Sequence, residues 1–450
     1  MAARHQAYPE YQKAIVDWMG EVPAGWDIKP CRSIVQNMEK KNEGALDQNY
    51  LSLMANVGVI LYEDKGDVGN KKPDDLSKCK IVIKGNLVIN SMNYSIGSYG
   101  MSEYDGVCSP VYIVLDPDIN VVHSRFALRI FENSPFQKYL ATFGNGILAH
   151  RAAIGWDDIK AAYIPVPPKE EQLYILDFLD HEIAKIDTLI NKQQQLIKLL
   201  KEKRQAVISH AVTKGLNPAT PMKDSGVEWF GEVPEHWVVT KFSYVALIVR
   251  GGSPRPAGDP TLFNGDYSPW VTVGEITKDD DIYLTETETF LTQKGSEQCR
   301  VFSPDTLLLT NSGGTLGVPK ILRISANAND GVIGFENLLL NREFTYFYLS
   351  TLTEKLRDQI RNKGGSTQIN LNTDIVKNIS VPLPPKEEIE SIVAYLFDRI
   401  DKYKRLETNA EAGIKLLQER RTALISAAVT GKIDVRNWQP VQPKIPMGVK

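Results

Sequence analysis

The sequence predicts an α+β protein made of two similar halves, each a globular segment followed by a long helix. Three observations predict it. Blocks of sequence recur in the two halves, a heptad pattern runs between the Pro-Pro-Lys-Glu-Glu block and the next recurring block of each half, and short β-like runs fill the globular segments. The repetition indicates pseudo-twofold internal symmetry, with the two long helices pairing as an antiparallel coiled coil between the globular segments.

The repeat is visible in three blocks. Pro167-Pro168-Lys169-Glu170-Glu171 returns as Pro384-Pro385-Lys386-Glu387-Glu388, an offset of 384 − 167 = 217, and residues 206–213 return at 423–430 with the same offset. Gly20-Glu21-Val22-Pro23 returns as Gly231-Glu232-Val233-Pro234, an offset of 231 − 20 = 211. The difference (217 − 211 = 6) falls inside the globular segments. The helices are therefore a constant frame, and the globular segments vary.

The organisation expected from these landmarks has seven parts. They are a leading segment (1–19), a first globular segment (20–168), a first helix (169–216), a linker (217–230), a second globular segment (231–385), a second helix (386–431) and a tail (432–450). Each globular segment has short β-like runs, such as residues 87–90, 270–273 and 306–310, and then a helical pattern, at 126–143 and 344–361. Strands followed by a helix indicate α+β segments rather than a doubly wound sheet.

Both long helices carry an apolar seam with a spacing of 3.5 residues, which favours coiled-coil packing. An alternative is that each helix lies on its own globular segment, but two equivalent seams in one chain favour mutual pairing. Arg204 and Arg421 occupy equivalent seam positions, where polar residues commonly fix register. The expected pairing residues are Leu176, Leu179, Ile183, Ile186, Ile190, Ile197, Leu200 and Arg204 in the first helix, and Val393, Leu396, Ile400, Ile414, Leu417 and Arg421 in the second.

The composition is that of an ordinary cytoplasmic protein. Hydrophobic residues make up 42% and charged residues 24%, and the net charge of −3 gives no global attraction to nucleic acid, although a local basic surface remains possible. The four cysteines are scattered, which indicates reduced thiols rather than disulfides or a zinc site. No apolar run resembles a signal peptide or approaches the ~20 residues that span a bilayer, so no membrane association is expected.

Catalytic motifs are not evident in the sequence. No Asn/Asp-Pro-Pro-aromatic methyltransferase motif and no Walker loop occurs, and Asn311-Ser312-Gly313-Gly314-Thr315 lacks the Gly-Lys-Ser/Thr ending of a phosphate loop. The six histidines lie far apart in the sequence, so no metal cluster is expected. We therefore expect no catalytic residue, cofactor or metal, and we expect partners to supply any chemistry.

Several motifs together resemble the specificity subunit of type I restriction-modification systems. They are residues 225–237, which include Trp229, Gly231 and Trp237, residues 311–317, residues 365–368 and the paired Pro-Pro-Lys-Glu-Glu blocks. The resemblance covers almost the whole chain. It implies two target recognition domains joined by two helices and a non-catalytic subunit that reads a split, asymmetric site in double-stranded DNA. It also implies partners, namely two copies of a methyltransferase (modification) subunit and restriction (translocase-nuclease) subunits. The first half departs from the pattern at Ala149, His150 and Arg151, which replace Ser366, Thr367 and Gln368.

Sequence readout needs donors and acceptors that reach base edges, set among cations that hold phosphates. Three stretches of the second segment meet this need. They are a Gly-Pro loop with an arginine at each end, a loop after a strand that is rich in amides and hydroxyls, and a polar stretch with a lysine. A pair of solvated arginines on a turn is the alternative for the first loop. The candidates are Arg250, Ser253, Arg255, Asn311, Ser312, Thr315, Lys363, Ser366, Thr367 and Gln368.

The first segment offers lysine clusters for phosphate, although exposed lysines are more often simply solvated. It also offers a loop after a strand that mixes amides with an aromatic ring, which we interpret as base-reading. The candidates are Lys40, Lys41, Asn42, Lys71, Lys72, Asn90, Asn93, Tyr94, His150 and Arg151.

Alternative functions stay open at this point. The chain could be the recognition subunit of a related methylating nuclease outside type I, a coiled-coil scaffold that binds only protein, or a single-chain enzyme with an unrecognised site. In the favoured interpretation the helices act as a ruler. About 45 helical residues span roughly 65 Å, which is on the order of two turns of B-DNA at ~34 Å each.

Overall fold

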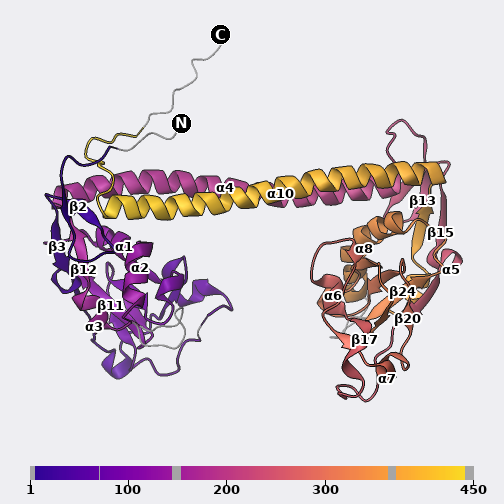
Figure 1. Cartoon of the computed structure of the whole chain (residues 1–450), viewed down its shortest axis with the longest axis horizontal. Coiled ribbons are helices and arrows are strands. Elements are labelled where there is room, and N and C mark those ends of the chain that lie inside the picture. Colours follow the sequence, from indigo (N-terminus) through magenta and orange to yellow (C-terminus); the bar gives the residue numbers. More distant parts are fainter. Residues whose placement is uncertain (1–5, 70, 144–153, 363–370, 441–450) are drawn as a thin grey trace, which may run out of the picture. The chain divides into compact units, whose positions relative to one another are not determined.

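The computed structural model describes residues 6–69, 71–143, 154–362 and 371–440 of the chain. Its contacts divide the chain into two compact units. Unit 1 comprises Met1–Gln194 with Glu411–Lys450, and unit 2 comprises Gln195–Ala410. Each unit holds one globular domain and a part of both long helices (Figure 1). We call the globular parts domain 1 (residues 20–168) and domain 2 (residues 231–385).

The long helices are α4, Lys169–Lys214, and α10, Lys386–Val429. Each begins directly after a Pro-Pro pair, and each carries two glutamates in its first turn, where the helix dipole favours negative charge. Gly215 ends α4 with a φ of +73°, a left-handed conformation that glycine adopts without steric cost. The sequence placed the helix ends at 216 and 431, two residues beyond the observed ends.

In unit 1 the first half of α4 packs against the last part of α10. Because the start of one helix meets the end of the other, the helices run antiparallel, as the repeated seam predicted. The shared core contains Leu176, Leu179, Ile183 and Ile186 of α4 with Leu424, Ile425, Ala428 and Val429 of α10, and Ile190 and Leu417 lie at its edge.

In unit 2 the last part of α4 packs against the first half of α10, which gives the same antiparallel arrangement. The shared core contains Ile208, Ala211 and Val212 of α4 with Ile389, Ile392 and Leu396 of α10, and Val207, Val393 and Ile400 lie at its edge. Leu200 is buried, and Ile197 and Ile414 are half-buried. The predicted pairing of the helices is therefore confirmed.

Domain 1 is built around a four-stranded sheet of order β4-β11-β8-β9, with three further two-stranded sheets, β5-β6, β10-β7 and β12-β3. Its main core packs α1 and α2 against this sheet through residues such as Phe126, Phe131 and Phe136. The elements of unit 1 before α4 are β1 Tyr11–Lys13, β2 Glu21–Pro23, β3 Asp27–Pro30, β4 Val35–Asn37, β5 Leu51–Met54, β6 Gly58–Leu61, β7 Lys80–Val82, β8 Leu87–Asn90, β9 Tyr99–Met101, β10 Gly106–Cys108, β11 Tyr112–Pro117, α1 Ser124–Glu132, α2 Ser134–Ala141, α3 Trp156–Ala161 and β12 Tyr163–Val166.

The two larger sheets of domain 2 have the orders β16-β24-β21-β22-β18 and β19-β17-β23-β20, in which the pairs β18·β22 and β17·β23 are parallel. The described residues also form the two-stranded sheets β15-β25 and β13-β14. Helix α8 packs on the first sheet through Phe344, Phe347 and Tyr348. The elements are β13 Met222–Val227, β14 Gly231–Pro234, β15 Val238–Lys241, α5 Phe242–Val245, β16 Leu247–Arg250, β17 Phe263–Val271, α6 Val273–Thr277, β18 Tyr283–Leu284, β19 Phe290–Leu291, α7 Gln293–Ser296, β20 Val301–Phe302, β21 Leu307–Thr310, β22 Pro319–Leu322, β23 Ala326–Ala328, β24 Val332–Glu336, α8 Arg342–Asn362, α9 Thr373–Lys377 and β25 Ser380–Leu383.

Two local predictions were wrong. The helical pattern over 126–143 is two helices, α1 and α2, separated by Asn133, whose backbone is extended (ψ 113°) and which is followed by Ser134 and Pro135. The run 270–273 was read as strand, but Val273 starts α6 because the side chain of Thr272 caps that helix by accepting a hydrogen bond from the Glu275 amide. In the first place a proline in the first turn of the new helix marks the break, and in the second a capping hydrogen bond overrode an apolar pattern.

Candidate nucleic-acid interface

The candidate loop of domain 2, residues 250–255, leaves the edge strand β16 and crosses the turn 328–331. The Gly251 amide donates to the Val332 carbonyl and the Gly252 amide to the Ala328 carbonyl, each over 2.9 Å. A Cβ on Gly251 would lie 2.3 Å from the Asn329 carbonyl oxygen, so only glycine fits this crossing. The glycines thus bring the two flanking arginines close to the turn.

Asp330 is the residue on which these candidates converge, and the sequence interpretation missed it. Its carbonyl oxygen accepts from Arg250 Nε over 2.7 Å and from Asn311 Nδ2 over 3.0 Å. Its carboxylate accepts from Ser253 Oγ over 2.8 Å and lies 4.0 Å from the Arg255 guanidinium. Four predicted residues from two loops therefore surround one turn, whereas the sequence separates Arg250 from Asp330 by 330 − 250 = 80 positions.

The cations of this cluster remain available to a ligand. Arg250 is exposed, and 71% of the Arg255 side chain is accessible, as is 48% of Asp330. Asn311 differs, because it is buried and its amide, carbonyl and side chain all take part in joining strands and loops. The two arginines and Ser253 therefore form the surface available to phosphate or base edges. Asn311 lies beneath this surface and holds the turn through its hydrogen bond to the Asp330 carbonyl.

The 311–315 loop follows β21, as predicted, and is closed by Thr310. The Thr310 hydroxyl donates to the Thr315 carbonyl over 2.5 Å and accepts from the Val318 amide over 2.9 Å. Ser312 and Thr315 are half-exposed next to this closure. Their hydroxyls are accessible to a ligand. We interpret them as candidates for contacts with the DNA phosphate backbone rather than with base edges.

In domain 1 the amide-rich loop after β8 also lies on a hollow. Asn90 and Asn93 help to line a cavity of about 220 Å³ together with Tyr50, Ser52, Tyr112 and Lys65. Lys65 is buried and its ammonium lies 4.7 Å from the Tyr62 ring centroid, a contact that no sequence motif revealed. The hollow brings amides, phenols and a cation together.

Two candidates of domain 1 are part of its interior. Tyr94 is buried and donates its hydroxyl to the Phe131 carbonyl over 2.6 Å, so it cannot stack on a base without leaving the core. Asn42 is buried and binds the Asp47 amide and carbonyl and the Leu76 carbonyl. We therefore omit both from the proposed contact surface. The sequence pattern gave no sign that Tyr94 ties its loop to α1 or that Asn42 closes its own loop.

The lysine candidates lie on the surface of domain 1. Lys40, Lys41, Lys71 and Lys72 are exposed, and Lys72 donates to the Gln48 carbonyl over 3.2 Å. The candidates His150, Arg151, Lys363, Ser366, Thr367 and Gln368 lie outside the described residues.

Neither a cluster of metal ligands nor a cysteine with a lowered pKa is found among the described residues. Within these residues, no group of three or more His, Cys, Asp and Glu side chains could hold a metal ion. Burial raises the pKa of the Cys108 thiol to about 12 and also raises the pKa of Cys31, which disfavours the nucleophilic thiolate. No helix in the same residues is long and apolar enough to cross a membrane.

Comparison with known protein families identifies the family of this chain. The profile of the type I restriction modification DNA specificity domain matches residues 25–199 and again residues 234–416. The chain belongs to this family. The two matches fall on the two halves of the sequence repeat, so each half is one copy of the domain.

Two relatives of this family match nearly the full length of the chain. The putative type I restriction enzyme MjaX specificity subunit of Methanocaldococcus jannaschii is 21% identical over 93% of this chain and 96% of its own length. The EcoKI specificity subunit of Escherichia coli is 23% identical over 95% of this chain and 93% of its own.

Solved structures share the fold. A chain from a structure of the assembly and conformational transition of the type I R-M system has a TM-score of 0.70, with 17% identity over 91% of this chain and 98% of that chain. The HsdS subunit of Thermoanaerobacter tengcongensis has a TM-score of 0.51, with 17% identity over 92% and 98%. The predicted fold class is confirmed.

Proposed function

We propose that this specificity-family protein is the DNA-recognition subunit of a type I restriction-modification complex. It would bind a bipartite, asymmetric site in double-stranded DNA, with one half-site read by each domain. The observation that carries the proposal is the double match of the specificity domain on a chain whose two halves hold different loops on equivalent helices. Constant helices with variable loops suit a protein that reads two different sequences.

The loop cluster around Asp330 is the proposed reading surface of domain 2. The exposed guanidiniums of Arg250 and Arg255 are suited to phosphate or to guanine, which arginine binds with two hydrogen bonds. The shared turn fixes the spacing between the two arginines before DNA arrives. In domain 1 we assign the corresponding role to Asn93, which is exposed, and to Asn90, which is buried but lines the polar hollow.

The chain itself is proposed to be non-catalytic and to dock catalytic partners on its long helices. Exposed leucines support this, because they occur in equivalent pairs. Leu189 and Leu406 (189 + 217 = 406) are 46% and 48% exposed, and Leu199 and Leu416 (199 + 217 = 416) are 61% and 65% exposed. Two equivalent apolar faces predict two copies of one modification subunit. Restriction subunits would join the same complex.

The test is to co-express the chain with the methyltransferase encoded beside its gene and to map methylated sites across a genome. A single split motif with a fixed unspecified gap is expected. A contiguous motif would contradict two separate readers. Absence of methylation and of DNA binding, with the partner bound, would instead support a protein-only scaffold. Methylation or cleavage by the purified chain alone would make it an enzyme.

A recognition subunit of a related methylating nuclease outside type I would produce the same reading domains. The two are separated by the partners that co-purify. Separate modification and restriction subunits support the type I complex, whereas one fused polypeptide that methylates and cleaves supports the alternative.

A further inference from the structure

Domain 2 meets the long helices at a place where both helices present a cation. Arg204 of α4 and Lys404 of α10 line the same hollow of about 140 Å³, together with Asp279, Asp280 and Asp281 of domain 2. These aspartates form a turn that follows α6. All five residues belong to unit 2.

Each aspartate of this turn pairs with a cation on a different element. Asp280 lies 3.7 Å from Arg204, and Asp281 lies 3.1 Å from Lys404. Asp279 pairs with Lys320 of β22, whose side chain is almost fully buried. Asp279 thus anchors the turn to the domain, and the next two carboxylates reach the two helices.

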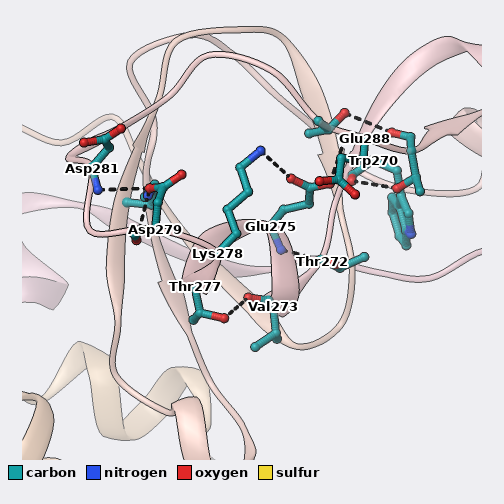
Figure 2. A network of polar contacts seen from close by, with 12 residues as sticks. Trp270, Thr272, Val273, Glu275, Thr277, Lys278, Asp279, Asp281 and Glu288 are labelled. Carbon is teal, nitrogen blue, oxygen red and sulfur yellow. Dashed lines mark hydrogen bonds and ion pairs between the residues drawn. The ribbon is translucent and has the colours of Figure 1, made fainter. Parts of the chain in front are cut away.

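The turn is held in shape by its own network (Figure 2). The Asp281 amide donates to the Asp279 carboxylate over 2.9 Å, and Lys278 lies 3.1 Å from Glu275 at the end of α6. The hydrogen bond from Lys320 lowers the pKa of Asp279 below its usual value, so this carboxylate is ionised at neutral pH. The carboxylates that face the helices are therefore presented by a fixed support.

The internal repeat shows what is unusual about the cation pair. Position 404 is equivalent to position 187 (187 + 217 = 404), and position 421 to position 204 (204 + 217 = 421). In unit 1 these positions hold Asp187 and Arg421, which pair across the two helices over 3.6 Å. In unit 2 the same positions hold Lys404 and Arg204, two like charges. The helices therefore neutralise each other in unit 1, whereas in unit 2 the carboxylates come from the domain.

Domain 1 contacts its helix with the opposite polarity. Arg125 and Arg129 of α1 pair with Asp180 of α4, the second over 3.3 Å. The position equivalent to Asp180 is Phe397 (180 + 217 = 397), whose ring lies 5.6 Å from that of Phe347 in domain 2. Cations on domain 1 thus meet a carboxylate on the helix, and carboxylates on domain 2 meet helix cations.

We propose that Arg204 and Lys404 form a cationic docking site that favours a globular domain whose turn presents carboxylates, as Asp280 and Asp281 do. The site helps to make domain 2 specific to its place on the helices, because a domain without these carboxylates would leave the like charges of Arg204 and Lys404 without a partner. A domain transplanted into the second position needs acidic residues in this turn or compensating changes on the helices.

The test is a double charge reversal, Asp280→Lys with Asp281→Lys, in the full-length chain. Asp279 is left unchanged because its loss would leave the buried Lys320 ammonium unpaired. Exposed ion pairs are individually weak, so the double reversal is chosen because it replaces two attractions with two repulsions. We expect a lower urea midpoint at low salt and a smaller loss at high salt, where charges are screened. Asp266→Lys, at an exposed carboxylate elsewhere in domain 2, is the control.

The decisive variant adds Arg204→Glu and Lys404→Asp to the double reversal. Recovery of the urea midpoint in this fourfold variant is expected, and failure to recover would overturn the docking site. An unchanged midpoint in the double reversal would overturn it as well. If the double reversal does not fold, Asp281→Lys with and without Lys404→Asp makes the same comparison. Because the readout is unfolding, the result does not depend on the proposed DNA recognition.

Discussion

The indole Nε1 of Trp237 donates a hydrogen bond to Glu388 in the first turn of α10 over 2.9 Å. In the other half Trp26 donates in the same way to Glu171 of α4 over 3.1 Å. Both pairs join a buried tryptophan of the recurring Gly-Glu-Val-Pro motif to the start of the helix that follows the same domain. The sequence repeat is therefore a repeated contact, which fixes how each domain meets its helix.

Replacement of Glu388 by alanine should destabilise the protein by about 1–3 kcal/mol, because a buried indole N–H then loses its acceptor. Urea unfolding measures the change. Glu388→Gln keeps an acceptor and should cost less. The Trp237→Phe variant lacks the donor. Adding Glu388→Ala to this variant should therefore lower the free energy of unfolding by less than the same substitution does in the wild type. Equal costs in both backgrounds would show that the hydrogen bond is not what stabilises this contact.

Asp330→Ala should weaken recognition of the half-site read by domain 2 and strengthen binding to unrelated DNA. The first effect follows because Ser253 loses its acceptor and Arg255 its neighbouring charge. The second follows because a negative charge is removed beside two exposed arginines, and phosphate contacts dominate non-specific affinity. The measurement is binding to specific and unrelated duplexes over a range of salt.

The control for Asp330 is Asp266→Ala, which removes an exposed carboxylate elsewhere in domain 2. An equal rise in non-specific binding in both variants would show that only net charge matters. Loss of both half-sites in Asp330→Ala would show a general folding defect instead of a local role.

Periodicity and repetition predicted the frame of this protein well, whereas the binding surface was only partly predictable. The seam residues were predicted because a heptad is local and repeats, and burial of Leu176 or Leu396 follows from their spacing alone. Asp330 was missed because it meets Arg250 and Ser253 only after the sheet forms. Tyr94 was misread because its hydroxyl bonds the Phe131 carbonyl of α1, a contact that forms only when the helix packs on the loop. The roles of Asp330 and Tyr94 depend on tertiary contacts, which the spacing of residues in the sequence does not reveal.

Polar substitution of the exposed helix leucines should reduce partner binding without affecting either globular domain. Leu189→Ser with Leu416→Ser changes unit 1, and Leu199→Ser with Leu406→Ser changes unit 2. Each pair should lower the number of bound modification subunits from two to one, as measured by native mass spectrometry. Retention of two copies in both variants would place the docking surface elsewhere on the chain.

Exchange of residues 231–385 for the matching segment of a relative should alter one half-site of the methylated motif and leave the other unchanged. Each domain has its own core, so the half-site read by domain 1 does not depend on the fold of domain 2. A donor segment that carries acidic residues at positions 280 and 281 is the appropriate choice. Genome-wide methylation mapping gives the result, and a change in both half-sites would contradict independent reading.

Deletion of one heptad from each helix should shorten the unspecified gap without changing either half-sequence. Residues 190–196 and 407–413 are equivalent (190 + 217 = 407) and leave the four exposed docking leucines in place, and removing whole heptads keeps the seam in register. Seven residues at ~1.5 Å each are about 10 Å, which corresponds to roughly 3 base pairs at ~3.4 Å each. Deleting four residues from each helix breaks the seam and should reduce stability, which separates loss of register from loss of length. A methylated motif with its original gap in the heptad variant would show that the helices do not set the spacing.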